Sequence, residues 1–345
     1  MSLLEVKNLH TYFKTKKGIV KAVNDVTYSL DEGKTLGIVG ESGSGKSVSA
    51  MSIIKLLDGN GWIDSGSVTF NGRDILSCTE KEMYHIRGNE ISVIFQEPMT
   101  SLNPVFTVER QIGEVLQIHQ NMTKKQAYAK AAALLADVKI PNPERVAKQY
   151  PFQLSGGMRQ RVMIAMALAC SPRLIIADEP TTALDVTIQA QILDLLRSLK
   201  DKINSSIMFI THDLGVIAEM ADYVVVMYAG RIVEQGTAEE IFAHPAHPYT
   251  IGLMASKPVV GKQVDKLYSI PGKVPNPINM PNYCYFKDRC EMCVAQCSGE
   301  YPCEISISPT HKVSCYRYYD GKRPDLEEQV EREMADRADN GKEGE

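Results

Sequence analysis

The stretch TLGIVGESGSGKS (35–47) constrains the fold more than any other part of the chain. Its last eight residues fit the pattern G-x-x-x-x-G-K-[ST], and the apolar run before them predicts a buried strand. In this pattern, successive backbone N–H groups face phosphate oxygens, and the N-terminus of the following helix favours negative charge. We therefore expect a phosphate-binding loop between a strand and a helix. Its members are Gly40, Ser42, Gly43, Ser44, Gly45, Lys46 and Ser47.

Four side chains in and beyond this loop predict phosphoryl chemistry. Lys46 would reach the β- and γ-phosphates of a nucleotide, and the Ser47 hydroxyl would ligate Mg²⁺. The segment LIIADEP (174–180) places two carboxylates at the end of another buried strand. There Asp178 would hold Mg²⁺, while Glu179 would act on a water beside the γ-phosphate. The two motifs together predict hydrolysis of a nucleoside triphosphate.

Apolar runs that predict strands alternate with segments that predict helices, which indicates a parallel α/β sheet. The expected strands are 35–40, 91–96, 173–179, 205–213 and 223–230. The expected helices follow Gly45 and span 123–138, 158–169 and 187–202. Between about 97 and 158 the sequence is mostly helical, so we expect a helical subdomain there.

Charge and hydropathy exclude several classes of protein. The net charge of −4, with mixed signs along the chain, gives no basic face for nucleic acid, so no nucleic-acid partner is expected. The N-terminus lacks the pattern of a signal peptide, and no apolar run approaches the roughly 20 residues that span a bilayer. A cytoplasmic protein is expected.

The segment LSGGMRQR (154–161) supplies a second anion site, because Ser155, Gly156 and Gly157 offer a hydroxyl and open amides at a helix start. With this segment, residues 4 to about 255 resemble the ATP-binding cassette (ABC) family, whose LSGGQ signature closes on nucleotide held by another subunit. Met158 stands where the family usually has Gln. The resemblance implies an α/β P-loop NTPase fold: a RecA-like core with antiparallel β and helical subdomains, plus a small Cys-rich extension.

The resemblance also implies roles for four further residues. Gln96, followed by EPMTSLNP, matches the Q-loop residue that senses Mg²⁺ and γ-phosphate. Asp185 in TTALD matches the D-loop aspartate, and His212 in MFITHD matches the switch histidine at the γ-phosphate. Phe13, or Tyr12 as the alternative, would stack on adenine. The implied activity is ATP hydrolysis with Mg²⁺.

Two C-terminal features narrow the resemblance to the ATPases of oligopeptide, dipeptide and nickel importers. The first is AHPAHPYT (243–250), which resembles their HPY segment; its His244 and His247 are not expected to bind metal. The second is a cysteine-rich region, which includes HKVSC (311–315). Peptide import is the expected function. The alternatives are import of nickel or antimicrobial peptides and a soluble ABC ATPase outside transport, which would usually carry a coiled coil or tandem cassettes.

Four cysteines are expected to bind a metal centre, with Cys293 and Cys303 as nearby extras. In a reducing cytosol, clustered cysteines favour metal binding, and four thiolates suit either Zn²⁺ or a [4Fe–4S] cluster. Their spacing leaves zinc, iron and unliganded thiols open. The resemblance implies the iron cluster, with a structural role. The expected ligands are Cys284, Cys290, Cys297 and Cys315.

The resemblance further implies partners and a location. We expect a second, homologous ATPase in a heterodimer, two transmembrane permeases and an extracytoplasmic peptide-binding protein, with this chain peripheral on the cytoplasmic face of the cell membrane. Three divisions of the chain are expected from its sequence. They are an ATPase domain at 1–257, an importer extension at 258–322 and a charged tail at 323–345.

Overall fold

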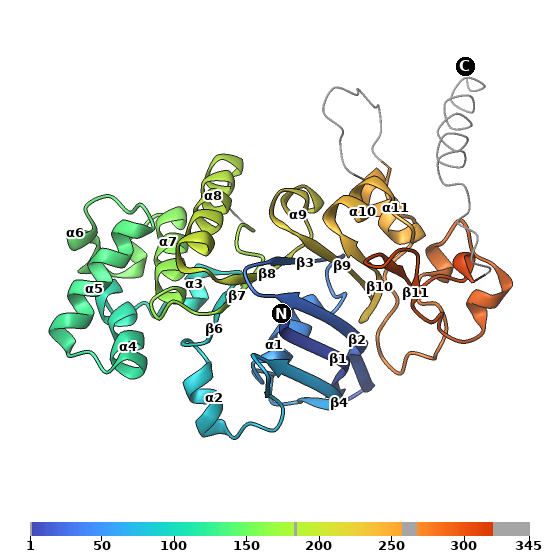
Figure 1. Ribbon diagram of the computed structural model, residues 1–345, viewed down its shortest axis with the longest axis horizontal. Coiled ribbons are helices and arrows are strands. Elements are labelled where there is room, and N and C mark those ends of the chain that lie inside the picture. Colours follow the sequence, from blue (N-terminus) through green and yellow to red (C-terminus); the bar gives the residue numbers. More distant parts are fainter. Residues whose placement is uncertain (1, 183–184, 257–267, 320–345) are drawn as a thin grey trace, which may run out of the picture. The chain divides into compact units, whose positions relative to one another are not determined.

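The computed structural model describes residues 2–182, 185–256 and 268–319 (Figure 1). The expected charged tail, 323–345, lies outside the described residues. Within the described ranges no helix is both long and apolar enough to cross a membrane.

The chain forms two compact units, which we call the core unit and the C-terminal unit. The core unit comprises the residues up to Arg231 together with a short segment, Pro277–Asn279. The C-terminal unit comprises the described residues of 232–276 and those from Met280 onward. The second unit therefore begins within the range that the sequence assigned to the ATPase domain.

A parallel sheet is the centre of the core unit, with strands in the order β9-β3-β8-β7-β6. Its central strands are buried on both faces, as their near-continuous runs of branched apolar residues require. The predicted parallel α/β fold is confirmed. The strands are β3 (Thr35–Val39), β6 (Ile91–Ile94), β7 (Leu174–Asp178), β8 (Ser206–Thr211) and β9 (Tyr223–Tyr228). The helices that alternate with them are α1 (Lys46–Ile53), α8 (Val186–Ile203) and α9 (Leu214–Met220).

A second, antiparallel sheet of the core unit has the order β2-β1-β4-β5, so β2 lies at its edge. Helix α1 packs against β1 and β2. This packing joins the antiparallel sheet to the helix that follows the phosphate loop. The elements of this region are β1 (Ser2–Thr15), β2 (Gly18–Asp31), β4 (Gly61–Phe70), β5 (Arg73–Asp74) and α2 (Glu80–Ile86).

The segment 97–158 forms helices throughout its regular elements, as its composition predicts. Helix α5 begins at a capping box, in which Thr123 and Gln126 each satisfy a backbone N–H of the other. Helices α4 and α5 pack together, and α7 contacts both as well as β6. The elements are α3 (Pro98–Ser101), α4 (Val108–Gln120), α5 (Lys124–Asp137), α6 (Pro143–Ala147), η1 (Pro151–Gln153) and α7 (Gly156–Ala167).

The C-terminal unit is built on β10, whose residues Glu234 and Gln235 pair with Val313 and Lys312 of β12. Strand β12 in turn pairs with β11. A small core of Ala246, Val313, Cys315 and Tyr318 supports this sheet. The elements are β10 (Arg231–Thr237), α10 (Ala238–Ala243), α11 (Pro248–Ala255), η2 (Lys287–Arg289), η3 (Ala295–Ser298), β11 (Ile305–Ser306), β12 (Lys312–Val313) and η4 (Tyr316–Tyr318).

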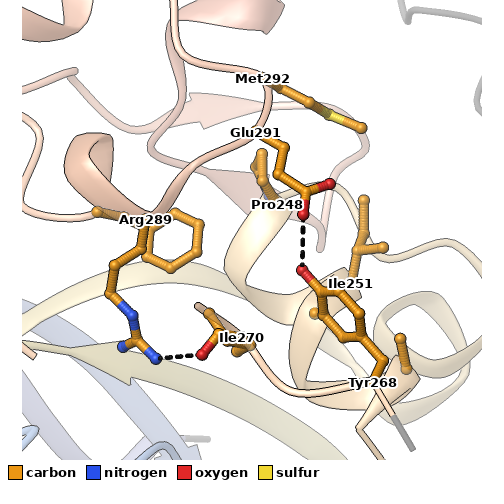
Figure 2. A pocket seen from close by; sticks show the side chains of 10 residues that line it. Pro248, Ile251, Tyr268, Ile270, Arg289, Glu291 and Met292 are labelled. Carbon is orange, nitrogen blue, oxygen red and sulfur yellow. Dashed lines mark hydrogen bonds between the residues drawn. The ribbon is translucent and has the colours of Figure 1, made fainter. Parts of the chain in front are cut away.

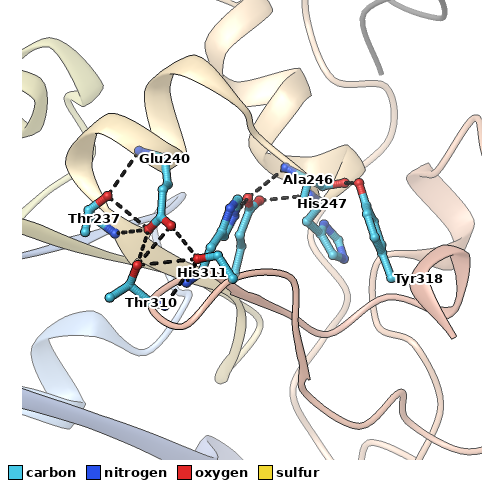
Figure 3. A network of polar contacts seen from close by, with 9 residues as sticks. Thr237, Glu240, Ala246, His247, Thr310, His311 and Tyr318 are labelled. Atoms are coloured by element: carbon cyan, nitrogen blue, oxygen red, sulfur yellow. Dashed lines mark hydrogen bonds and ion pairs between the residues drawn. The ribbon is translucent and has the colours of Figure 1, made fainter. Parts of the chain in front are cut away.

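Two carboxylates tie distant segments of the C-terminal unit together (Figure 3). Glu234 is fully buried and accepts hydrogen bonds from Ala246 N at 2.7 Å, His247 N at 2.8 Å and His311 Nε2 at 2.7 Å. Glu240 accepts from the Thr310 hydroxyl at 2.9 Å and from the backbone N–H of Thr237, also at 2.9 Å. The HPY segment and the HKVSC segment are thus held by the same buried carboxylate.

A small cavity of about 60 Å³ lies between α11 and the segment that precedes Met292 (Figure 2). Arg289 donates from Nε to Pro271 O at 2.8 Å, and Tyr268 donates to Glu291 at 3.3 Å. The cavity is much smaller than the roughly 300 Å³ at which ligand pockets begin. Its polar groups therefore serve the packing of this unit.

Candidate active site

The phosphate loop runs from the end of β3 to the start of α1, and its shape depends on glycine. Gly43 and Gly45 have φ of +77° and +96°, a region that side chains disfavour. A Cβ on Gly45 would lie only 2.3 Å from the carbonyl oxygen of Ala22 in β2. Only glycine fits this close approach, so the shape of the loop requires the glycine that the motif places there.

Two buried polar groups of the loop fit a phosphate ligand. Lys46 is 5% exposed, and its ammonium donates to Gly40 O at 2.8 Å and Glu41 O at 3.0 Å. Burial lowers the pKa of Lys46. Ser44 Oγ is buried and has no hydrogen-bond partner among the described residues. Since buried polar atoms are rarely left unpaired, the loop is suited to bring an anionic ligand to these groups.

Asp178 and Ser47 form the predicted pair of oxygen donors for Mg²⁺. The Ser47 hydroxyl donates to Asp178 Oδ1 at 2.8 Å, across 131 positions of sequence. Burial raises the pKa of Asp178, and the hydrogen bond from Ser47 opposes that effect. Hydroxyl and carboxylate oxygens are ligands that Mg²⁺ prefers, so this pair fits the ion.

Three side chains contact the Glu179 carboxylate, two of them from distant parts of the sequence. Its carboxylate accepts from Gln96 Nε2 at 3.1 Å and from the Thr182 hydroxyl at 2.9 Å, and it lies 3.2 Å from His212 Nδ1. Glu179 also has φ of +46°, unusual for a residue with a side chain. Such strain gathers at functional sites. Thr182 was missed by the sequence analysis, although its place three residues beyond Glu179 in DEPTT was a usable signal.

These groups line one cavity of about 400 Å³, a volume in the range of small-molecule sites. The structure therefore brings together the predicted loop, carboxylate, Q-loop and switch residues. The cavity is lined by Ser42, Gly43, Ser44, Gly45, Lys46, Ser47, Val48, Gln96, Glu179, Thr182 and His212.

Besides Gly40 and Asp178, three predicted groups do not line this cavity. Phe13 is in β1, paired with Val20 of β2 and Gly61 of β4. Ser155 begins α7, where its hydroxyl accepts from Met158 N at 3.4 Å; the predicted Gly156 and Gly157 form the first turn of that helix. Asp185 begins α8 and accepts from Ile188 N at 2.8 Å. Ser155 and Asp185 are both exposed.

Gln160, in helix α7 of the LSGGMRQR segment, contacts the loop that follows Glu179. The sequence did not predict this contact. Its side chain is 1% exposed and donates from Nε2 to Pro180 O at 2.6 Å. Pro180 follows Glu179 directly. Helix α7 is therefore linked by one buried amide to the loop that carries the candidate base.

The cysteine region gives a different result. Among the described residues, no three His, Cys, Asp or Glu side chains are arranged to hold a metal ion. The expected metal centre is thus not supported by the geometry. Burial raises the pKa of Cys284 to about 12, and the charges of Cys297 and Cys290 add to this. Burial likewise raises the pKa of Cys290 and of Cys315 to about 11. The thiols therefore lie near one another without forming a ligand set.

Two family models match the chain. The model described as "ABC transporter" matches residues 23–182, and the model described as "Oligopeptide/dipeptide transporter, C-terminal region" matches residues 233–297. The first range includes the phosphate loop, Gln96, the signature and both carboxylates. The second includes β10, the HPY segment and three of the four cysteines expected to bind metal.

Curated relatives and solved structures agree with these matches. The oligopeptide transport ATP-binding protein AppD of Bacillus subtilis is 51% identical, over 92% of this chain and 97% of the relative. The oligopeptide transport ATP-binding protein OppD of Escherichia coli is 50% identical, over 92% of this chain and 93% of the relative. The dimeric ATP-binding cassette MJ0796, solved in a post-hydrolysis state with ADP and phosphate, is 28% identical with a TM-score of 0.62, covering 68% of this chain and 98% of that one.

Proposed function

The chain belongs to the ABC transporter family of ATP-binding proteins, and from this membership we propose that it hydrolyses ATP to drive import of oligopeptides or dipeptides. One observation carries the proposal. Four separate sequence motifs converge on a single cavity, and in it a buried lysine, an unpaired hydroxyl and a hydrogen-bonded glutamate face the same space. The matching C-terminal model and the peptide-transport relatives support the peptide cargo.

The chemistry follows from the side chains in the cavity. The Lys46 ammonium would neutralise the β- and γ-phosphates, and the amides of the glycine loop would orient them. Ser47 and Asp178, with Gln96, would hold Mg²⁺, which when bound neutralises phosphate charge. Glu179 would accept the proton of the attacking water. His212 and Thr182, which contact the Glu179 carboxylate, would fix its orientation.

We propose that the active form is a head-to-tail dimer with a homologous ATPase. Ser155 and the two glycines at the start of α7 offer amides and a hydroxyl to an anion but do not line this chain's own cavity. A second subunit would bring its nucleotide to them. The relative MJ0796 was solved as a dimer, which supports the arrangement. Ser155→Arg should therefore reduce hydrolysis of the nucleotide bound by the partner, whereas a loss confined to this chain's own site would contradict the dimer.

Two transmembrane permeases are the proposed membrane partners, which places the chain peripherally at the cytoplasmic face of the membrane. Several large apolar side chains near the Q-loop are exposed, which is unusual unless a partner covers them. Tyr150 and Phe152 stack at 5.6 Å, and Phe152 is 65% exposed. The other members are Phe95, Met99 and Val105. We expect Phe152→Asp to lower co-purification with the permeases while ATP binding is kept.

The proposed [4Fe–4S] cluster stands on the donor set alone. The thiols at 284, 290, 297 and 315 are not arranged as metal ligands in the structure. Burial, and then the charges of neighbouring thiols, raise the pKa of Cys284, Cys290 and Cys315, and four thiolates suit iron–sulfur or zinc. Anaerobically purified protein should hold about four irons per chain, lost in Cys290→Ser. Stoichiometric zinc in protein from cells supplied with iron would contradict the cluster and indicate a zinc site. Metal-free protein would indicate unliganded thiols.

Uptake in proteoliposomes tests the transport function. The full chain, its partner ATPase, both permeases and the extracytoplasmic peptide-binding protein would be assembled, and entry of a labelled tripeptide measured with and without ATP. ATP-dependent peptide entry supports the proposal. Entry of nickel but not peptide would assign a different cargo, and steady ATPase activity that no permease alters would indicate a soluble ATPase.

A further inference from the structure

A short segment from the C-terminal part of the chain, Pro277–Asn279, belongs to the core unit. It lies along the start of β2, the edge strand of the antiparallel sheet. Ile278 forms an antiparallel bridge with Val20, and Asn279 N donates to Ile19 O at 2.9 Å. Main-chain pairing of this kind is how an extended peptide attaches to a sheet edge. We call this segment the strap.

The Asn279 side chain adds specific contacts to this pairing. Its Oδ1 accepts from Ile19 N at 3.2 Å. Its backbone has φ of +51°, a conformation that asparagine tolerates better than most residues. A Cβ on Gly18 would lie 2.6 Å from Asn279 Nδ2. The strap therefore packs closely against the tip of the β1–β2 hairpin, through the Asn279 side chain on one side and the absence of a side chain at Gly18 on the other.

The residues that the strap contacts are neighbours of two parts of the proposed nucleotide site. Val20, bridged to Ile278, is also the register partner of Phe13, the proposed adenine platform. Ala22, two residues further along β2, touches Gly45 of the phosphate loop through its carbonyl oxygen. One short stretch of β2 thus connects the strap, the aromatic ring and the phosphate loop.

We propose that the strap is a positioning element for adenine. By pairing with the edge of β2 it fixes the hairpin tip, so that Phe13 stays at the distance from the phosphate loop that a bound adenine requires. This inference rests on the adenine role proposed for Phe13. Asn279 acts through the hairpin and does not touch the nucleotide.

The test compares ligands with and without a base. Dissociation constants of Mg²⁺–ATP and Mg²⁺–tripolyphosphate would be measured by calorimetry on the full-length chain. Asn279→Gly keeps the backbone conformation but removes the side-chain acceptor; loss of one hydrogen bond predicts about 3- to 5-fold weaker ATP binding. Binding of tripolyphosphate should be unchanged. Asn279→Asp, which retains the acceptor oxygen, should restore ATP affinity.

Two further variants make the result specific. Gly18→Ala disturbs the same contact from the hairpin side and should give the same selective loss. Asn121→Gly is the matched control, because Asn121 has the same φ of +51° at the end of α4, in a different part of the core unit. Equal ATP affinities in Asn279→Gly and Asn121→Gly would overturn the proposal, as would an equal loss of tripolyphosphate binding.

Phe13→Ala separates the strap from the role on which it rests. Stacking contributes about 1–3 kcal/mol per base, so this variant should weaken ATP about 5- to 100-fold. If ATP binding is unchanged in Phe13→Ala, the adenine role and the strap's function both fail. The phosphate loop as the ATP-binding site is tested separately, by Lys46→Ala. If Phe13→Ala weakens ATP binding and Asn279→Gly does not, only the strap proposal fails.

Discussion

Two glutamate–histidine pairs, one in each unit, have the same chemistry and opposite surroundings. In the core unit Glu179 lies 3.2 Å from His212, whose side chain is 59% exposed beside the nucleotide cavity. In the C-terminal unit Glu234 lies 2.7 Å from His311, and both side chains are fully buried (Figure 3). Among the described residues, the Glu179 carboxylate contacts side chains, whereas the Glu234 carboxylate also accepts hydrogen bonds from two backbone N–H groups.

This difference separates a reactive carboxylate from a structural one. Gln96 and His212 lie on segments separate from Glu179 and can rearrange when a substrate enters, so Glu179 can exchange these contacts for a water molecule. Backbone donors in a closed core cannot move without unfolding, so Glu234 stays bound. A buried, hydrogen-bonded carboxylate is also costly to remove, because its donors are left unpaired.

Glu234→Gln should destabilise the C-terminal unit most. The new amide NH₂ would replace one carboxylate oxygen and so face the backbone donor of either Ala246 or His247, and we expect a loss of about 3–5 kcal/mol in the free energy of unfolding. Hydrogen exchange of peptides from this unit would measure it. Glu240→Gln, at a partly exposed carboxylate, should cost much less. Comparable losses in the two variants would contradict the structural role of Glu234.

Glu179→Gln should abolish turnover without unfolding either unit. Removing the proton acceptor is expected to lower ATP turnover about 100-fold or more, with ATP affinity preserved. Turnover would be measured in the assembled transporter. Glu219→Gln, which alters a glutamate in a surface ion pair with Arg197, is the control and should keep normal turnover. Near-normal hydrolysis in Glu179→Gln would remove this residue from the mechanism.

Lys46→Ala should weaken nucleotide binding itself. Loss of a charged hydrogen-bond donor predicts a dissociation constant for ATP about 10- to 100-fold higher. Calorimetry on the full chain would detect this change. Lys34→Ala, in a surface ion pair with Asp222, should leave affinity unaltered. Equal affinity in the two variants would argue against the phosphate loop as the binding site.

His247 should make the C-terminal unit sensitive to acid. Burial lowers its pKa from 6.5 to about 3, so between these values the unfolded chain binds a proton that the folded chain does not. The free energy of unfolding should therefore decrease as the pH is lowered below 6.5, by about 1.4 kcal/mol per pH unit. His247→Asn should lack that slope between pH 6.5 and 5, above the range in which Glu240 titrates. A slope unchanged in the variant would assign it to other groups.

The sequence determined those features that depend on local order. The motif GESGSGKS and the strand before it specify the phosphate loop, because left-handed glycines and inward amides are properties of consecutive residues. Alternating apolar runs likewise specified the parallel strands, and their observed bounds differ from the expected ones by no more than two residues at either end. The roles of Lys46, Asp178 and Glu179 followed from the same local context.

Contacts between residues that are far apart in the sequence depend on tertiary packing. Gln160 acquires its contact with Pro180 only when α7 packs against the loop after β7, and nothing in its immediate sequence neighbours predicts that contact. The pairing of Glu234 with His311 spans 77 positions, and the strap reaches Ile19 across 260. These contacts depend on burial and strand register, which the folded chain sets as a whole. A local pattern therefore specifies a loop, while the partners of a buried carboxylate exist only in the assembled core.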